Sequence, residues 1–325
     1  MSNKGNCLTQ KFTNPFPFSD NNKRYHTLNY YNKQKFGGKV IKISLNGGFT
    51  CPNIDGTVGK GGCTYCSNAG SGDFAGNPNK PITAQFAEIK EIMGHKWSEG
   101  KYIAYFQAFT NTYAPIEILR EKYEEALGQE NVVGLTIATR ADAIADDVLD
   151  YLEELSHRTY LVVELGLQSI FNSTGERINR GHTFLQFQQA VERLKLRNIN
   201  VCVHIINGLP DETHNMMVET AKKIATMGLH SIKIHSLHII KGTKIADEYA
   251  NGEFKMITFD EYVSIVCDQL EYLPKEIVVE RLTGDGIKST LIAPIWSLDK
   301  KVVINAIDKE LFRRNSYQGI KHILL

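Results

Sequence analysis

Residues 39–70, KVIKISLNGGFTCPNIDGTVGKGGCTYCSNAG, join an apolar segment to a glycine-rich stretch that contains three cysteines. The first eight residues are typical of a strand buried on both faces, because apolar side chains occupy most consecutive positions. Nine of the 26 glycines lie between Gly47 and Gly76, and the interiors of helices and strands disfavour glycine. The sequence therefore predicts a long irregular loop after this strand, and such loops are usually functional or disordered.

The loop places Cys51, Cys63 and Cys66 within sixteen residues. A Cys-x-x-Cys pair lets two thiolates of one tight turn reach the same metal, and the glycine-rich arm can bring in the third. Three ligands leave one coordination position open, which suits a four-iron, four-sulfur cluster whose unique iron binds a substrate or cofactor. A structural zinc site needs a fourth ligand, which His26 or His95 could supply, and a loop without metal is the third alternative.

Apolar segments rich in Val and Ile alternate with helical patterns along most of the chain. The expected strands cover residues 39–46, 102–109, 132–139, 160–167, 199–206 and 231–238, and the expected helices cover roughly 83–98, 115–127, 143–156, 183–197, 212–227 and 259–272. Six alternations predict a parallel α/β sheet with right-handed crossovers, either an open doubly wound sheet or a partial barrel. In both architectures ligands bind at the carboxyl ends of the strands, where the cysteine loop emerges.

Composition restricts the class of protein. Hydrophobic residues make up 42% and charged residues 22% of the 325 residues, which is ordinary for a folded chain and too apolar for a disordered one. No window approaches 18 uninterrupted apolar residues, so we expect no membrane span. The first 20 residues lack the apolar core of a secretory signal. We therefore expect a cytoplasmic location, where clustered cysteines more often hold metal than form disulfides.

The net charge of +1 argues against a uniformly basic nucleic-acid-binding protein, but the charge is unevenly distributed. Residues 1–40 carry +6 and residues 300–325 carry +4, which leaves −9 between them. Aromatic residues accompany the first positive charges, at Phe12, Phe16, Phe18, Tyr25, Tyr30, Tyr31 and Phe36. Basic, aromatic arms suit an RNA partner, and the alternative is that these rings dock the arm onto the core.

We expect an N-terminal arm (1–38), a core domain (39–275) and a C-terminal extension (276–325).

Several segments resemble the radical S-adenosylmethionine (SAM) superfamily, over roughly residues 39–283. They are the cysteine loop ending in CTYC (63–66), ELGLQS (164–169), INRGH (178–182) and HIINGLPDET (204–213). Eleven residues separate Cys51 from Cys63, where the superfamily usually has three, and this long spacing resembles the branch of the Elongator catalytic subunit. The ELGLQS and GLPDET segments are similar to that branch and to oxygen-independent coproporphyrinogen oxidases. The resemblance implies a partial (β/α)6 radical SAM barrel.

The resemblance also implies site residues. Cys51, Cys63 and Cys66 would hold a 4Fe-4S cluster, and the amino and carboxylate groups of SAM would bind the fourth iron. Further contacts with SAM or the pocket are implied for Tyr65, Gln107, Glu164, Gln168, Arg180 and His204. Arg180 would pair with the methionine carboxylate of SAM, and Gln168 and Glu164 would hydrogen-bond ribose hydroxyls or the ammonium group. The segment that begins at Gln107 lacks the Gly-Gly-Glu usual at that place.

Residues outside these motifs have simpler expected roles. Cys202 and Cys267 occupy apolar-patterned positions and are expected to be buried small side chains, and Cys7 in the polar arm is not an expected ligand. Arg140 follows the third strand, where it either faces the pocket or pairs with an acidic neighbour such as Asp142.

The chemistry implied is reductive cleavage of SAM to methionine and a 5′-deoxyadenosyl radical, with an electron donor such as flavodoxin or ferredoxin. Together with the basic termini, the Elongator-like motifs favour tRNA modification, at a wobble-uridine side chain. A radical SAM enzyme acting on a small metabolite or a protein side chain is the second hypothesis. A non-catalytic, zinc-binding RNA adaptor is the third.

Overall fold

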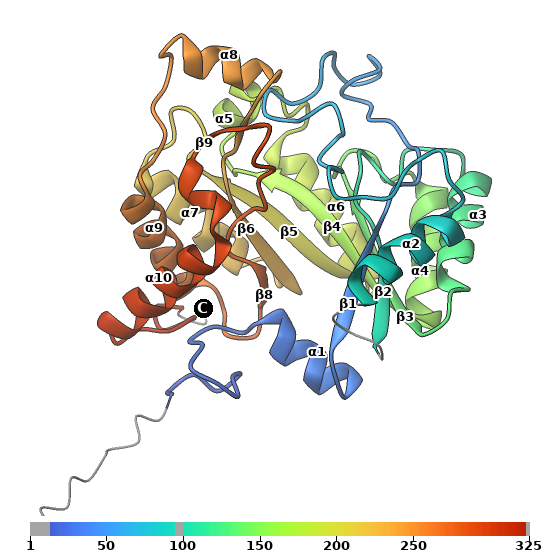
Figure 1. Ribbon diagram of the computed structural model, residues 1–325, viewed down its shortest axis with the longest axis horizontal. Coiled ribbons are helices and arrows are strands. Elements are labelled where there is room, and N and C mark those ends of the chain that lie inside the picture. The colour runs from blue at the N-terminus through green and yellow to red at the C-terminus, as the bar shows by residue number, and fades with distance from the viewer. Residues whose placement is uncertain (1–13, 95–99, 323–325) are drawn as a thin grey trace, which may run out of the picture.

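The computed structural model describes residues 14–94 and 100–322. Seven parallel strands curl into a half-barrel in the order β1-β2-β3-β4-β5-β6-β8 (Figure 1). Their bounds are β1 Val40–Leu45, β2 Lys101–Phe106, β3 Val132–Thr139, β4 Tyr160–Gln168, β5 Asn200–Asn207, β6 Ser231–Ser236 and β8 Val278–Arg281. The strand–helix pattern left an open sheet and a partial barrel both possible, and the partial barrel implied by the family resemblance is confirmed. All six expected strands are present, and β8 adds a seventh.

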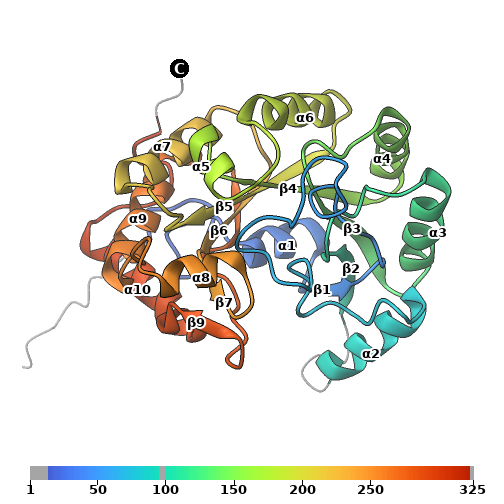
Figure 2. The same cartoon turned by 90° about the horizontal axis from the view of Figure 1, so that it is seen from above.

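Six crossover helices cover the outer face of the sheet (Figure 2). They are α2 Ile82–Gly94, α3 Ile116–Leu127, α4 Asp146–Arg158, α6 Phe184–Leu196, α7 His214–Ala225 and α9 Phe259–Tyr272. The Thr258 hydroxyl accepts from the Glu261 amide and the Glu261 carboxylate accepts from the Thr258 amide, so the predicted capping box of α9 is confirmed. The last expected residues of the first helix, 95–98, lie outside the described residues.

The N-terminal arm closes the open side of the half-barrel. Its helix α1 (Leu28–Phe36), which the sequence pattern did not predict, packs against both edge strands, β1 and β8. Thr27 forms a parallel bridge with Val279 of β8. Phe16 and Tyr25 are 2% and 5% exposed, so these two rings dock the arm, as the alternative interpretation held. Phe12 lies outside the described residues.

The remaining elements lie beside the mouth of the barrel and beside the strands formed by the C-terminal part of the chain. Helix α5 (Asn172–Arg177) follows β4, and α8 (Lys244–Ala250) follows the short strand β7 (Ile239–Ile240), which pairs antiparallel with β9 (Leu291–Ala293). A 3-10 helix, η1 (Ile295–Leu298), leads into α10 (Lys300–Arg313), which packs on α9. Among residues 14–94 and 100–322, we find no helix with the length and apolar character needed to cross a membrane.

Candidate functional site

One cavity of about 890 Å³ opens at the carboxyl ends of the strands. All nine residues that the sequence motifs single out line it: Cys51, Cys63, Tyr65, Cys66, Gln107, Glu164, Gln168, Arg180 and His204. They come from the cysteine loop and from segments after β2, in β4, after α5 and in β5. The fold thus brings together in one site residues that are up to 153 positions apart, as expected for ligand binding at this edge of a parallel sheet.

The segment after α5 clamps the cysteine loop to the barrel. The amide of Thr64 donates to the Ile178 carbonyl at 3.0 Å. The Asn179 side-chain amide donates to the carbonyl of Gly62 at 2.7 Å, and Asn53 returns a bond from Nδ2 to the Asn179 carbonyl at 2.6 Å. Asn179 has a φ of 52°, a left-handed conformation that Asn tolerates better than most residues. The INRGH segment therefore fixes the loop that carries the cysteines.

All three cysteines of the loop are half-buried and free. Burial raises the pKa of the Cys66 thiol to about 12. Burial also raises the pKa of Cys63, against the opposing field of Arg140. A bound metal stabilises thiolates directly, so these buried sulfurs suit metal ligation better than reaction with solvent. Asn53 Nδ2 lies 3.7 Å from the Cys63 sulfur, and Ser71 Oγ lies 3.7 Å from the Cys66 sulfur.

The distances between the three cysteine sulfurs bear on whether they hold a cluster or a single ion. Tetrahedral zinc with Zn–S bonds of about 2.3 Å holds its sulfurs roughly 3.8 Å apart. In the described ranges, the only three His, Cys, Asp or Glu ligand atoms within 4.8 Å of one another belong to Glu164, Cys202 and His204. At least one pair of the loop sulfurs therefore lies more than 4.8 Å apart, which fits a four-iron cluster, because such a cluster binds each thiolate at a different iron. The residues fit such a cluster.

The histidines proposed as a fourth zinc ligand do not support the zinc alternative. The His26 ring stacks on Phe18 at 4.9 Å in the N-terminal arm, and its Nδ1 lies 3.2 Å from the Glu276 carbonyl oxygen. His26 does not line the cavity. His95 lies outside the described residues.

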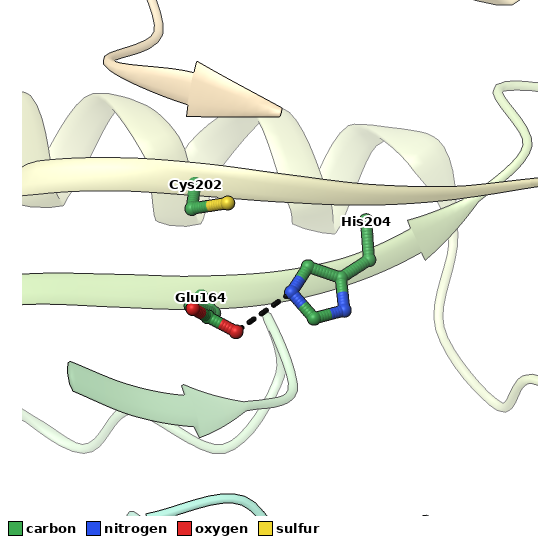
Figure 3. A group of neighbouring side chains, drawn as sticks. All are labelled: Glu164, Cys202 and His204. Atoms are coloured by element: carbon green, nitrogen blue, oxygen red, sulfur yellow. Dashed lines mark hydrogen bonds and ion pairs between the residues drawn. The ribbon is translucent and has the colours of Figure 1, made fainter. Parts of the chain in front are cut away.

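Glu164, Cys202 and His204 are close enough for one ion but form no convincing metal site. Figure 3 shows Cys202 and His204 on one strand beside Glu164 on the next. The Glu164 carboxylate already contacts two cations, Lys42 at 2.9 Å and Lys233 at 2.6 Å. A third cation would be repelled by both lysines at short range, so we assign this group to the protein's own charge network.

Glu164 is the centre of that network. Its side chain is fully buried, and besides the two lysines it accepts from the Tyr105 hydroxyl at 2.8 Å and contacts His204 Nε2 at 2.8 Å. Burial opposes ionisation, but the lysines outweigh burial and hold the pKa of Glu164 well below its usual range. The protein thus occupies both oxygens of Glu164, which leaves the implied SAM contact without support from this geometry.

Lys42 extends the network to Glu280 of β8. Its ammonium lies 2.7 Å from Glu280 Oε2, and the other Glu280 oxygen accepts from the Ser231 hydroxyl at 2.7 Å. The sequence motifs do not identify Lys42, Tyr105, Lys233 or Glu280. A detectable signal existed for Lys42 and Lys233, because a charged residue within an apolar strand of a parallel sheet must find a buried partner.

Arg180 and Arg140 organise the backbone around the site. Arg180 is 1% exposed, and its Nη1 donates to the carbonyls of Leu167 and Ser169 at 2.6 Å each. Its Nε donates to the His182 carbonyl at 2.9 Å, which leaves only Nη2 without a partner in the described parts of the chain. These contacts do not support a bidentate pair with SAM. Arg140 pairs with both oxygens of Asp142, at 3.0 and 2.8 Å, which is one of its two expected roles, and it also lines the cavity.

Gln168 fits a bound ligand best among the non-cysteine candidates. It lies at the irregular end of β4 with a φ of 62°, and its Oε1 is buried without a partner among the described residues. A buried acceptor of this kind needs a donor, which a ribose hydroxyl or ammonium group would supply. Gln107 is less available to a ligand, since its Nε2 already donates to the Ser71 carbonyl at 2.7 Å. Tyr65 packs against a second apolar cluster that includes Ile178 and Ile245.

The sequence and the fold of this chain are both similar to those of known proteins. The sequence model of the radical SAM superfamily matches residues 55–224, and that of the radical SAM C-terminal domain matches residues 229–313. YtqA of Bacillus subtilis is 55% identical over 94% of this chain and 95% of its own. A tRNA uridine(34) acetyltransferase of Methanocaldococcus jannaschii is 28% identical over 50% of this chain and 30% of its own. The structure of Elp3 from Methanocaldococcus infernus superposes with a TM-score of 0.65 at 19% identity, covering 86% of this chain and 64% of that one.

Proposed function

This chain belongs to the radical SAM superfamily, and we propose on that basis that it cleaves SAM reductively at a 4Fe-4S cluster held by Cys51, Cys63 and Cys66. The observation that carries this proposal is the placement of three half-buried thiols around one cavity, with at least one pair of their sulfurs more than 4.8 Å apart. When bound, such a cluster supplies one electron to the sulfonium of SAM, which yields methionine and a 5′-deoxyadenosyl radical.

The residues of the chain would bind SAM and protect the reaction from water. Gln168 would accept a hydrogen bond from SAM with its buried Oε1. Arg140, held by Asp142, would stabilise the negative charge of the thiolates. Arg180 is a positioning residue, since its bonds to the Leu167 and Ser169 carbonyls fix the end of β4, where Gln168 lies. The electron would come from a small redox protein such as flavodoxin or ferredoxin.

We infer that the substrate is tRNA, at a wobble-uridine side chain. Supporting this inference are the Elongator-like motifs and the similarity over half the chain to a protein named tRNA uridine(34) acetyltransferase. The basic termini also support it, although the buried rings of Phe16 and Tyr25 are not available for stacking on bases. A small metabolite or a protein side chain is the competing substrate class. The separation of at least one pair of loop sulfurs by more than 4.8 Å favours a cluster over the zinc of the adaptor hypothesis.

Comparison of the modified nucleosides in tRNA, with and without the gene, tests the proposal. Mass spectrometry of tRNA from a deletion strain should show loss of a modified uridine, and the wild-type gene should restore it. A variant with Cys51, Cys63 and Cys66 replaced by Ala should fail to restore it, whereas the matched control Cys202→Ala should succeed. An unchanged nucleoside profile in the deletion strain would exclude tRNA as the substrate.

A further inference from the structure

The inner wall of the cavity contains a charge network whose net charge is zero. Lys42, Glu164, Lys233 and Glu280 come from four different strands and all line the cavity. Lys42 contacts Glu164 at 2.9 Å and Glu280 at 2.7 Å, and Lys233 contacts both oxygens of Glu164 at 2.7 and 2.6 Å. Each lysine is thus neutralised by carboxylates of the protein itself, and neither is available as the sole partner of an anionic ligand.

Most other charged groups of the wall are also matched within the protein, but the Arg180 guanidinium donates only to backbone carbonyls. Arg140 pairs with Asp142, and Arg281 lies 3.1 Å from Asp285. Asp73 is exposed, on the cysteine loop. Four cavity-lining histidines are neutral near pH 7, because burial lowers the pKa of His182, His204, His235 and His238. Apart from Arg180, the wall of the cavity therefore offers many hydrogen-bonding groups but no uncompensated positive charge.

Such a wall discriminates by charge. A carboxylate or phosphate that entered it would lose its hydration without gaining a free cation, which is costly. An uncharged polar group would exchange hydrogen bonds with water for hydrogen bonds with the wall at little net cost. We propose that the part of the cavity beside this network selects an uncharged polar group of the substrate, and that Glu280 sets this selectivity by neutralising Lys42. This inference rests on the proposed function, in which the group would be a nucleobase.

Replacing Glu280 tests how the charge of the network affects ligand selectivity. Within residues 14–94 and 100–322, its buried carboxylate contacts only Lys42 and the Ser231 hydroxyl. Glu280→Gln keeps the shape and can still accept from Ser231, but it leaves two lysines facing one carboxylate. The network then carries one positive charge beside the cavity, where the Lys42 side chain is 20% exposed.

The test compares two ligands that differ in charge and hardly in shape, 5-carbamoyluridine and 5-carboxyuridine. Calorimetry at pH 7.5 measures their affinities for the cluster-loaded protein with SAM. The wild type should bind the amide at least roughly tenfold more tightly than the carboxylate. Glu280→Gln should reduce this preference by about tenfold or reverse it. The double variant Lys42→Met/Glu280→Gln, again neutral, should restore the wild-type preference, and circular dichroism checks that all three proteins are folded.

Three results would overturn the inference: equal or tighter binding of the carboxylate by the wild type, no measurable binding of the amide, or an unchanged preference in folded Glu280→Gln. Formation of 5′-deoxyadenosine by the same wild-type preparation is measured in parallel. If this product forms while the preference is absent, the charge selectivity is wrong and the radical chemistry stands. If no 5′-deoxyadenosine forms, the proposed function itself fails, whatever the nucleosides do.

Discussion

Neutralising Glu164 should destabilise the protein more than any comparable change at its surface. In Glu164→Gln, Lys233 keeps only the Tyr105 hydroxyl, at 3.2 Å, and the uncharged carbonyl of the new amide, although its side chain is just 6% exposed. Breaking a buried ion pair by removing one partner costs about 3–5 kcal/mol. At about 2 °C per kcal/mol for a chain of this length, the melting temperature should fall by roughly 6–10 °C.

Two variants serve as controls. Glu164→Gln/Lys233→Met removes both partners of the ion pair and leaves Lys42 paired with Glu280. This double variant should recover most of the lost melting temperature, because replacing a whole buried ion pair often leaves stability unchanged. Glu219→Gln removes the carboxylate of the exposed pair with Lys222, whose side chains are 53% and 38% exposed. That change should shift the melting temperature by about 1 °C or less.

The pH dependence follows from the direction of the pKa shift. The pKa of Glu164 is lowered in the folded protein, so its contribution to stability is complete above the ordinary carboxyl pKa and is lost as the pH falls through the lower, folded value. The difference between wild type and Glu164→Gln should therefore stay constant from pH 8 to pH 5 and shrink only in stronger acid. Thermal unfolding of the metal-free proteins by circular dichroism measures this. A Glu164→Gln protein that melts within 2 °C of wild type, or a double variant that melts no higher than the single, would refute the reasoning.

Three other substitutions test separate parts of the site. Asn179→Ala removes the side-chain bonds that hold the cysteine loop. It should weaken iron binding by about 10- to 100-fold, as the loss of other supporting residues of metal sites does. Iron retained against a chelator measures this effect, and full retention would show that Asn179 does not hold the loop in place. Gln168→Ala should weaken SAM binding by roughly 5- to 100-fold through one lost buried hydrogen bond, measured by equilibrium dialysis, and unchanged affinity would remove Gln168 from the SAM site. Phe16→Ala should lower the free energy of unfolding by about 3–5 kcal/mol and leave tRNA affinity in a filter-binding assay unchanged. A fall in tRNA affinity with no loss of stability would instead mean that this ring stacks on RNA.

The sequence predicted the fold well because its signals are local and repeated. Each buried parallel strand is a run of apolar residues, and each crossover helix has its own periodicity, so the six alternations could be read directly. Strand β8 was missed because its four residues, Val278–Arg281, end in two charges and give no clear run. Helix α1 was missed because its segment is mostly polar and its stability comes from packing against β1 and β8.

The candidate site was predictable only where chemistry follows from spacing. The three cysteines and Gln168 could be found from motifs, and the cavity contains them. The motifs also pointed to Arg180 and Glu164, but a motif does not tell whether a charged side chain faces a ligand or the protein. That depends on neighbours from distant strands, such as Lys42 and Lys233, which lie 122 and 69 positions from Glu164.

Anaerobic reconstitution with iron and sulfide tests the central claim most directly. The wild-type protein, given a reductant, SAM and tRNA from the deletion strain, should bind four irons per chain, as the proposed cluster requires, and release 5′-deoxyadenosine. The variant with Cys51, Cys63 and Cys66 replaced by Ala should do neither, while Cys202→Ala should do both. Stoichiometric zinc in place of iron, with no 5′-deoxyadenosine from the wild type, would contradict the account.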